Sequence, residues 1–266
     1  MINTRRLLTI MTQLRDPDMG CPWDRKQNFR SLVPYLLEEA HEVIDAIDRN
    51  DTTALQDELG DLLFQIVFHS QIAEENALFD FESVAGGICD KLTRRHPHVF
   101  GDAVFASDKE REQAWEDAKA SERRDRNPSN QPVSVLDGIT ASLPALMVAD
   151  KLQSRAASHG FDWPEVTPVF EKVEEELGEV REALESGDKA HIREEIGDLL
   201  FVVVNLARHL GVEPETALKQ GNGKFTRRFH YIEQKIVEKG KVLDDCSLNE
   251  LDALWDEAKE KLIGMP

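Results

Sequence analysis

Apolar residues recur at spacings of three and four along most of the chain, which is the period of an amphipathic α-helix. The strict alternation of apolar and polar residues that is typical of strands is absent from the sequence. Short polar segments with turn-forming residues, at 48–51, 96–102 and 185–189, separate the helical stretches. The pattern therefore predicts an all-α protein.

This helical pattern occurs twice in the chain. "LLEEAHEVIDAI" (36–47) resembles "VEEELGEVREAL" (173–184), and "DELGDLLFQIVF" (57–68) resembles "EEIGDLLFVVVN" (194–205), both at an offset of 137 residues (194 − 57). Two more blocks follow in the same order, because "KLTRRH" resembles "KFTRRF" and "WEDAK" resembles "WDEAK". Four matched blocks in one order indicate an internal repeat.

The repeat predicts two domains built from the same unit. We expect an N-terminal domain at 1–120 and a C-terminal domain at 135–266. The segment between them, 121–134, is polar and contains proline, which is typical of a linker.

Each copy carries two pairs of acidic residues, and the members of a pair are three residues apart. The eight acids are Glu39, Glu42, Glu58 and Asp61 in the first copy, and Glu176, Glu179, Glu195 and Asp198 in the second. Residues three apart share one face of a helix. Short turns centred on Asn50 and Gly187 would fold each pair of helices into an antiparallel hairpin, with its four acids at matching heights. We therefore expect four carboxylates to converge in each copy.

Converging carboxylates repel one another and need protons, basic partners or a metal ion. A single ExxE pair is ordinary on a solvated helix face, but a doubled set in the same register beside an apolar run favours a metal site. Carboxylate ligation without His or Cys suits a hard cation such as Mg²⁺ or Mn²⁺. Gly60 and Gly197 lie inside the second helix of each hairpin and weaken it by up to ~1 kcal/mol relative to Ala, which close approach of the helices would explain.

Basic residues follow the hairpin in both copies. Lys224, Arg227 and Arg228 lie within about one helical turn, and Lys91, Arg94 and Arg95 occupy the corresponding positions in the first copy. Lysine and arginine on one face suit phosphate groups, as a point charge and a planar fork respectively. Ion pairs with surface acids are the alternative role for these residues.

Tryptophans mark the remaining candidate segments. Trp255 could stack on a base or pack in the core, and the core is the favoured place for Trp115. The segments "CPWDRKQ" (21–27) and "GFDWP" (160–164) precede the two acidic hairpins and could cover the site or cap the bundle. The histidines show no metal-ligand pattern that recurs in both copies, so we expect them to serve packing or the surface.

Charge and cysteine content narrow the class of partner. The 32 basic and 51 acidic residues give a formal net charge of −19, which disfavours nucleic acid polymers and anionic membranes. No stretch approaches the roughly 18 apolar residues that a membrane span needs. Three cysteines without a CxxC pair argue against a zinc site and suit a reducing cytoplasm.

EExxE followed by ExxD in each hairpin, with "ALMVADKLQSRAASHGFDW" and "KFTRRF", resembles the MazG-type nucleoside triphosphate pyrophosphohydrolases of the all-α pyrophosphatase group. The resemblance covers nearly the whole chain, including the duplication. It implies two tandem MazG-like helical bundles, a homodimer, and Mg²⁺-dependent hydrolysis of NTPs and dNTPs to the monophosphate and pyrophosphate. It also implies that the second copy is the main catalytic unit.

The resemblance assigns roles to residues of the second copy. The implied metal ligands and catalytic groups are Glu176, Glu179, Glu195 and Asp198. The implied nucleotide contacts are Lys172, Lys224, Arg227, Arg228 and Trp255. The first copy keeps the same acids, so Glu39, Glu42, Glu58, Asp61, Lys91 and Arg95 form a second candidate site. Two alternatives stay open: a narrower pyrophosphohydrolase for dUTP or phosphoribosyl-ATP, and a non-enzymatic helical scaffold.

Overall fold

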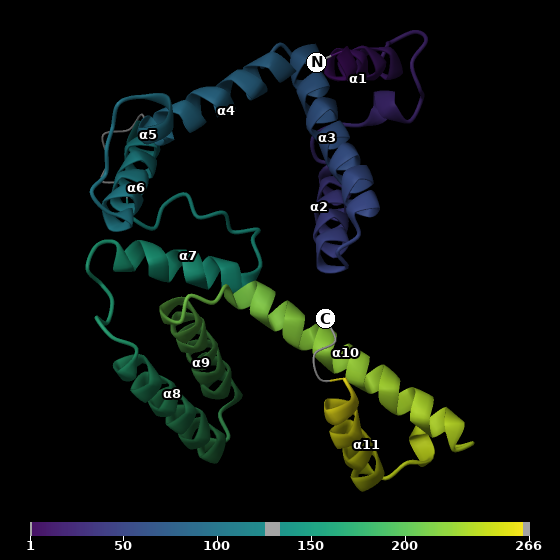
Figure 1. The fold of residues 1–266 in the computed structure, drawn as a ribbon, viewed down its shortest axis with the longest axis vertical. Helices are drawn as coiled ribbons and strands as arrows, with labels where there is room; N and C mark the ends of the chain where they lie inside the picture. Colours follow the sequence, from purple (N-terminus) through teal and green to yellow (C-terminus); the bar gives the residue numbers. More distant parts are fainter. Residues whose placement is uncertain (1, 126–133, 263–266) are drawn as a thin grey trace. The chain divides into compact units, whose positions relative to one another are not determined.

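A computed structural model describes residues 2–125 and 134–262 of the chain. Every regular element in these two stretches is a helix, which confirms the all-α prediction. The chain divides into two compact units, Met1–Glu122 and Arg123–Pro266, called unit 1 and unit 2 below (Figure 1). None of the described helices is both long and apolar enough to cross a membrane.

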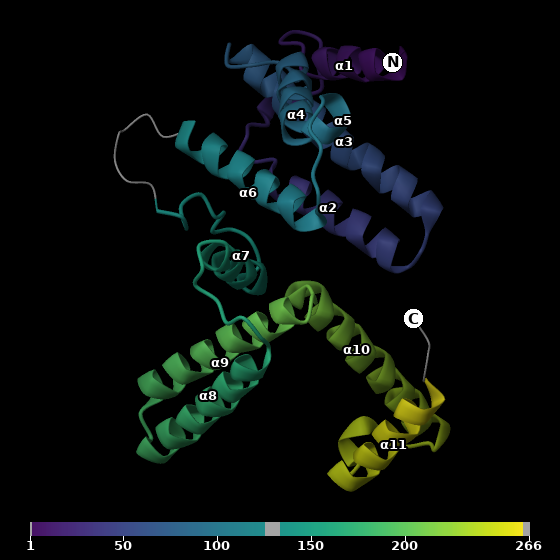
Figure 2. The ribbon, with the colours of Figure 1, turned by 60° about the vertical axis from the view of Figure 1, so that its left-hand side comes forward.

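Unit 1 is built around a hairpin of two long helices. Its elements are α1 (Ile2–Leu14), η1 (Asp24–Lys26), α2 (Val33–Asp48), α3 (Thr52–Glu75), α4 (Phe81–Arg95), α5 (Pro97–Phe100) and α6 (Asp108–Asp125). Helices α2 and α3 run side by side, and α1 packs across α3 (Figures 1 and 2). The buried core at this crossing consists of Met11, Leu32, Val67, Phe68 and Ile72.

Unit 2 repeats the hairpin and adds a second pair of helices. Its elements are α7 (Ala145–Ala157), α8 (Thr167–Ser186), α9 (Lys189–His209), α10 (Pro214–Glu238), η2 (Leu243–Asp245) and α11 (Leu248–Lys261). Helices α8 and α9 form the hairpin, and α7 packs on α9. Helix α11 packs on α10 through Ile232, Ile236 and Leu254. The two pairs diverge from the region of α7 (Figures 1 and 2).

Both hairpin turns fall where the spacing of the acids predicts them. Asn50 and Gly187 adopt left-handed backbone conformations, with φ of 54° and 70°. Asn tolerates this region and Gly enters it without a steric cost, so each residue reverses the chain directly after a helix. The carboxylates of Asp51 and Asp188 then accept hydrogen bonds from backbone N–H groups in the first turns of α3 and α9. The predicted hairpin geometry is therefore confirmed.

One expectation about local structure is wrong. A Cβ atom added at Gly60 or Gly197 would meet no other atom within 4 Å, so the helices do not approach closely there. Helix α6 continues to Asp125 and so overlaps the first residues of the expected linker; Glu122 near its end forms ion pairs with Arg94 and Arg95 of α4. Residues 126–133 of that expected linker lie outside the described residues.

Candidate metal and nucleotide site

Three of the four predicted acids of unit 2 converge between α8 and α9. Glu176, Glu179 and Glu195 each offer a carboxylate oxygen, and these oxygens lie within 4.8 Å of one another; we call them the unit 2 carboxylate group. Glu176 and Glu179 are three residues apart on α8, so they share a face, and the antiparallel hairpin brings Glu195 opposite them. Asp198 is exposed on α9 and stands outside this set of oxygens.

Glu176 is the most buried member, at 5% exposure. Its Oε1 atom forms an ion pair with Lys172 Nζ at 2.7 Å, and the same ammonium group forms a second ion pair with Glu175 at 2.8 Å. The hydrogen bonds to these two carboxylates raise the pKa of Lys172, so the lysine stays charged. Glu176 Oε2 is buried without a hydrogen-bond partner.

Electrostatic repulsion is visible at the neighbouring acid. Burial, and then the negative charge of Glu176, raise the pKa of Glu179, while Lys172 opposes this shift. A buried carboxylate oxygen without a partner is rare and calls for an explanation. The position of Glu176 Oε2 beside two further carboxylates fits a hard cation that takes oxygen ligands. The residues present therefore suit Mg²⁺ or Mn²⁺.

Sequence reasoning missed one contact of this group. His191 Nε2 lies 3.0 Å from Glu195 Oε1, one helical turn away on α9. The signal available was the i,i+4 spacing of histidine and glutamate, which places both on one face. The first copy has Ala54 at the corresponding position, so this spacing does not recur in both copies.

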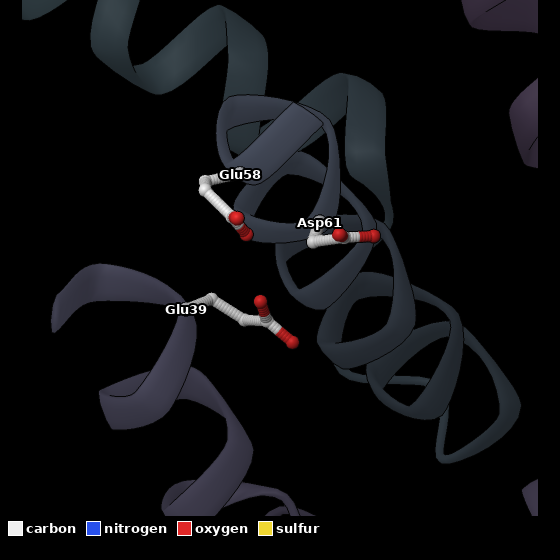
Figure 3. A group of neighbouring side chains, drawn as sticks. All are labelled: Glu39, Glu58 and Asp61. Carbon is white, nitrogen blue, oxygen red and sulfur yellow. The ribbon is translucent and has the colours of Figure 1, made fainter. Parts of the chain in front are cut away.

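Unit 1 contains a similar set of acids. Glu39 of α2 faces Glu58 and Asp61 of α3, and their oxygens lie within 4.8 Å of one another; we call these three the unit 1 carboxylate group (Figure 3). Burial, and then the charges of neighbouring carboxylates, raise the pKa of Glu39 and of Glu58. Glu42 stands outside the set but contributes to both shifts.

The predicted basic residues of unit 2 lie on the other helix pair. Lys224 and Arg227 are exposed on α10, and the Arg228 guanidinium lies 5.5 Å from the centre of the Trp255 ring. Trp255 is half-buried and packs against Phe225, with ring centres 5.2 Å apart. Within residues 134–262, no ion pair or hydrogen bond joins the predicted basic block or Trp255 to the unit 2 carboxylate group.

The corresponding residues of unit 1 make different contacts. Arg95 forms an ion pair with Glu122 at 2.5 Å and lies over the ring of Trp115, at 5.3 Å from its centre. The hydrogen bonds from Arg95 and Arg94 lower the pKa of Glu122 to about 2. Lys91 is half-buried on α4. In unit 1, Arg95 therefore binds an acid of α6.

A cavity of about 580 Å³ opens beside Lys172 in unit 2. Its lining residues come from α7, α8, α9, the segment between α7 and α8, and Leu136 before α7; they include Leu152, Gln153, Trp163, Lys172, Phe201 and Asn205. The tryptophan segment 160–164, whose role the spacing left open, therefore forms a wall of this cavity.

Asp162 anchors this wall to α9. Its Oδ1 atom lies 2.5 Å from the Arg208 guanidinium, with which it forms an ion pair, and 2.9 Å from His209 Nε2. Burial opposes ionisation of Asp162, but the hydrogen bonds from Arg208 and His209 outweigh it and hold the pKa below its usual value. Gly160, at φ of 86°, provides the left-handed turn that starts this wall. The segment is therefore fixed against the hairpin by ionic contacts.

Comparison with known proteins points to one family. The MazG nucleotide pyrophosphohydrolase domain matches the chain twice, at residues 27–100 and 167–232. The chain is 47% identical over 264 residues to the nucleoside triphosphate pyrophosphohydrolase of Escherichia coli K12, covering 98% of each chain. It is 45% identical over 253 residues to the nucleoside triphosphate pyrophosphohydrolase/pyrophosphatase MazG of Thermotoga maritima, covering 95% of this chain and 94% of that one.

A third relative extends the match to a longer protein. The chain is 45% identical over 253 residues to the uncharacterized protein YabN of Bacillus subtilis, covering 95% of this chain and 50% of that protein. The two matched segments contain the two hairpins with their carboxylate groups. The duplication, the acidic hairpins and these similarities agree: the chain belongs to the MazG family of nucleotide pyrophosphohydrolases.

Proposed function

We propose that this enzyme hydrolyses nucleoside and deoxynucleoside triphosphates to the monophosphate and pyrophosphate, using Mg²⁺ at the unit 2 carboxylate group. The observation that carries the proposal is the buried Glu176 Oε2 atom, which lacks a hydrogen-bond partner beside two further carboxylates. Membership of the family supplies the reaction class. The reducing environment suited to three unpaired cysteines supports a cytoplasmic location.

In this proposal the acidic residues bind the cation and Lys172 binds phosphate. Glu176, Glu179 and Glu195 would hold the cation, and Asp198 is one turn further along α9. When bound, the cation would neutralise the triphosphate and make a water molecule a better nucleophile. Lys172 brings a fixed positive charge to the same place, where it can bind a phosphate oxygen and stabilise charge on the departing pyrophosphate.

A homodimer is part of the proposal, and apolar faces on both hairpins support it. Ile196, Leu200 and Val203 share one face of α9 and are exposed. Their counterparts at the same 137-residue offset on α3 are exposed as well: Leu59, Leu63 and Ile66. Exposed apolar faces repeated in this way mark interaction surfaces.

The dimer would also account for the predicted nucleotide contacts on α10 and α11. Lys224, Arg227, Arg228 and Trp255 make no direct contact with the unit 2 carboxylate group among residues 134–262. A second copy that covers the α9 face with its own helices would offer its basic residues to the carboxylates of the first. We therefore propose that these four residues bind nucleotide in the dimer.

The decisive experiment incubates the purified enzyme with each NTP and dNTP in the presence of Mg²⁺ and separates the products. The proposal expects equal amounts of monophosphate and pyrophosphate. Orthophosphate as the product would overturn it. Turnover of dUTP or phosphoribosyl-ATP alone would establish a narrower enzyme. A Glu195→Gln variant that keeps full metal-dependent activity would contradict the assigned site, and a wild-type protein without activity would favour a binding scaffold.

A further inference from the structure

We propose that His191 is a nitrogen ligand at the unit 2 carboxylate group, and that this site therefore binds divalent cations of the later first transition row, such as Co²⁺ and Ni²⁺, more tightly than Mg²⁺. The inference rests on the proposed function in one respect, because it concerns the cation proposed for the same carboxylates. It adds a ligand and a class of cation to that site, since carboxylates alone suit hard cations.

The histidine lies next to one acid of the group. His191 and Glu195 are one turn apart on α9, so their side chains share a face of the helix. Nε2 of His191 lies 3.0 Å from Oε1 of Glu195, and the two side chains are 46% and 13% exposed. The imidazole therefore stands on the solvent side of this carboxylate, where a cation that arrives from water meets the site first.

The separation of these two atoms is that of neighbouring ligands on one cation. Two ligand atoms that are bound at right angles, each at about 2.1 Å, lie about 3.0 Å apart. His191 Nε2 stands outside the set of three oxygens that lie within 4.8 Å of one another. Because the side chain is half-exposed, its ring is free to turn toward Glu176 and Glu179 when a cation enters.

A buried oxygen on the opposite helix indicates a cation independently of the histidine. Glu176 of α8 is 5% exposed, and its Oε2 atom is buried without a hydrogen-bond partner. Lys172 contacts the other oxygen of this carboxylate, Oε1, at 2.7 Å. An unpaired buried carboxylate oxygen is unfavourable, and a cation bound between α8 and α9 would compensate it. The two helices thus supply ligands from opposite sides of one place.

An imidazole nitrogen changes which cations a carboxylate site prefers. Mg²⁺ takes oxygen ligands and gives up its water molecules reluctantly, so a nitrogen donor adds little to its binding. Imidazole suits transition cations such as Ni²⁺ and Zn²⁺, and affinity for sites of mixed nitrogen and oxygen ligands rises from Mn²⁺ through Co²⁺ to Ni²⁺. We therefore expect His191 to strengthen the binding of Co²⁺ and Ni²⁺ and to leave that of Mg²⁺ nearly unchanged.

The test measures the binding of three cations with and without the histidine. Calorimetric titration of the metal-free enzyme, without an affinity tag and without nucleotide, gives the Kd of Ni²⁺, Co²⁺ and Mg²⁺. His191→Ala should raise the Kd of Ni²⁺ and Co²⁺ by at least about tenfold. It should change the Kd of Mg²⁺ by less than about twofold. His230→Ala is the matched control, since His230 is exposed on α10, and it should change none of the three constants.

Further measurements distinguish a ligand from a side chain that only orients Glu195. A glutamine amide can donate a hydrogen bond to Glu195 but supplies no imidazole nitrogen, so His191→Gln should bind Ni²⁺ as weakly as His191→Ala. Glu195→Gln should weaken the binding of all three cations, which identifies the site. In NMR of the Co²⁺-loaded wild type, a bound imidazole should give a paramagnetically shifted N–H resonance that exchanges with water. This resonance should be missing from His191→Ala.

The outcomes separate this inference from the proposed function. Equal weakening of Mg²⁺ and Ni²⁺ binding in His191→Ala, or wild-type Ni²⁺ binding in His191→Gln, would overturn the ligand and show a residue that orients Glu195. Unchanged Ni²⁺ binding in His191→Ala, or a wild type that binds Ni²⁺ no more tightly than Mg²⁺, would overturn it as well. A wild type that binds Ni²⁺ through His191 but releases no pyrophosphate from any NTP with Mg²⁺ would end the proposed function alone.

Discussion

Lys172 Nζ lies 2.7 Å from Glu176 Oε1, one turn before it on α8, so a positive charge of the protein already occupies the edge of the unit 2 carboxylate group. The glutamate is 5% exposed, whereas the lysine side chain is 30% exposed. Removal of one partner of a buried ion pair leaves an uncompensated charge, which lowers the free energy of unfolding more than the loss of a surface pair does. The stability of the hairpin therefore depends on this lysine when no metal is present.

Lys172→Ala should destabilise the metal-free enzyme by about 1–3 kcal/mol, because it leaves Glu176 uncompensated beside two other acids. Mg²⁺ should raise the unfolding temperature of this variant more than that of the wild type. Thermal unfolding with EDTA and with Mg²⁺ measures both effects. Lys235→Ala is the matched control, since Lys235 is equally exposed but pairs with a surface acid. An equal loss of thermal stability in the two variants would contradict the role given to Lys172.

Glu176→Ala should lower kcat by at least about a hundredfold, because it removes the buried carboxylate that would hold the cation. Glu39→Ala is its counterpart in unit 1 and should leave most of the activity, since the buried carboxylate oxygen without a partner, among the described residues, is Glu176 Oε2 of unit 2. Pyrophosphate release under saturating NTP compares the two. Similar losses from both variants would mean that the two carboxylate groups are coupled or both turn over substrate.

Leu200→Glu should shift the enzyme from dimer to monomer in sedimentation velocity, because it puts a charge into the exposed apolar face of α9. The monomer should also lose activity, since the basic residues of α10 would no longer reach a neighbouring carboxylate group. Leu248→Glu changes an exposed leucine of α11 and serves as the control. A dimeric Leu200→Glu enzyme would show that this face is not the interface.

Glu122→Gln should lower the stability of unit 1 by an amount on the order of 1 kcal/mol at pH 7, after allowance for solvent screening. Arg95 and Arg94 hold the pKa of Glu122 at about 2, below its ordinary value of 4.5. For a carboxylate with a lowered pKa, the stabilisation is complete above the unfolded-state pKa and is lost as the pH falls through the folded-state pKa. The difference between variant and wild type should therefore shrink between about pH 4.5 and 2 in urea unfolding. A difference that stays constant down to pH 2 would contradict the ionic origin.

Phe68→Leu should destabilise unit 1 by about 1–2 kcal/mol, because it removes part of a fully buried ring from the core. Its kcat/KM for NTPs should remain that of the wild type, since the change is confined to the core of unit 1 and the proposed site lies in unit 2. Urea unfolding and pyrophosphate release measure the two quantities. A marked loss of kcat/KM without a loss of fold would show that unit 1 takes part in turnover.

The amino-acid sequence was sufficient to predict the helical class, the duplication and the two hairpins. These depend on local chemistry: the helical period, and turn residues such as Asn50 and Gly187 that enter the left-handed region. The spacing of acids along each helix was sufficient to place Glu176 and Glu179 on one face, and the turn position placed Glu195 opposite them. The EExxE and ExxD pattern of the hairpins, with the segments 145–163 and 224–229, resembles the family that the comparisons show.

Only the tertiary structure decided what surrounds those acids. The cavity beside Lys172 is lined by residues of α7, α8, α9, the segment between α7 and α8, and Leu136 before α7, so no single periodicity describes it. A carboxylate cluster is set by spacing within two adjacent helices, whereas an open or filled space depends on the volumes of side chains that meet from distant parts of the chain.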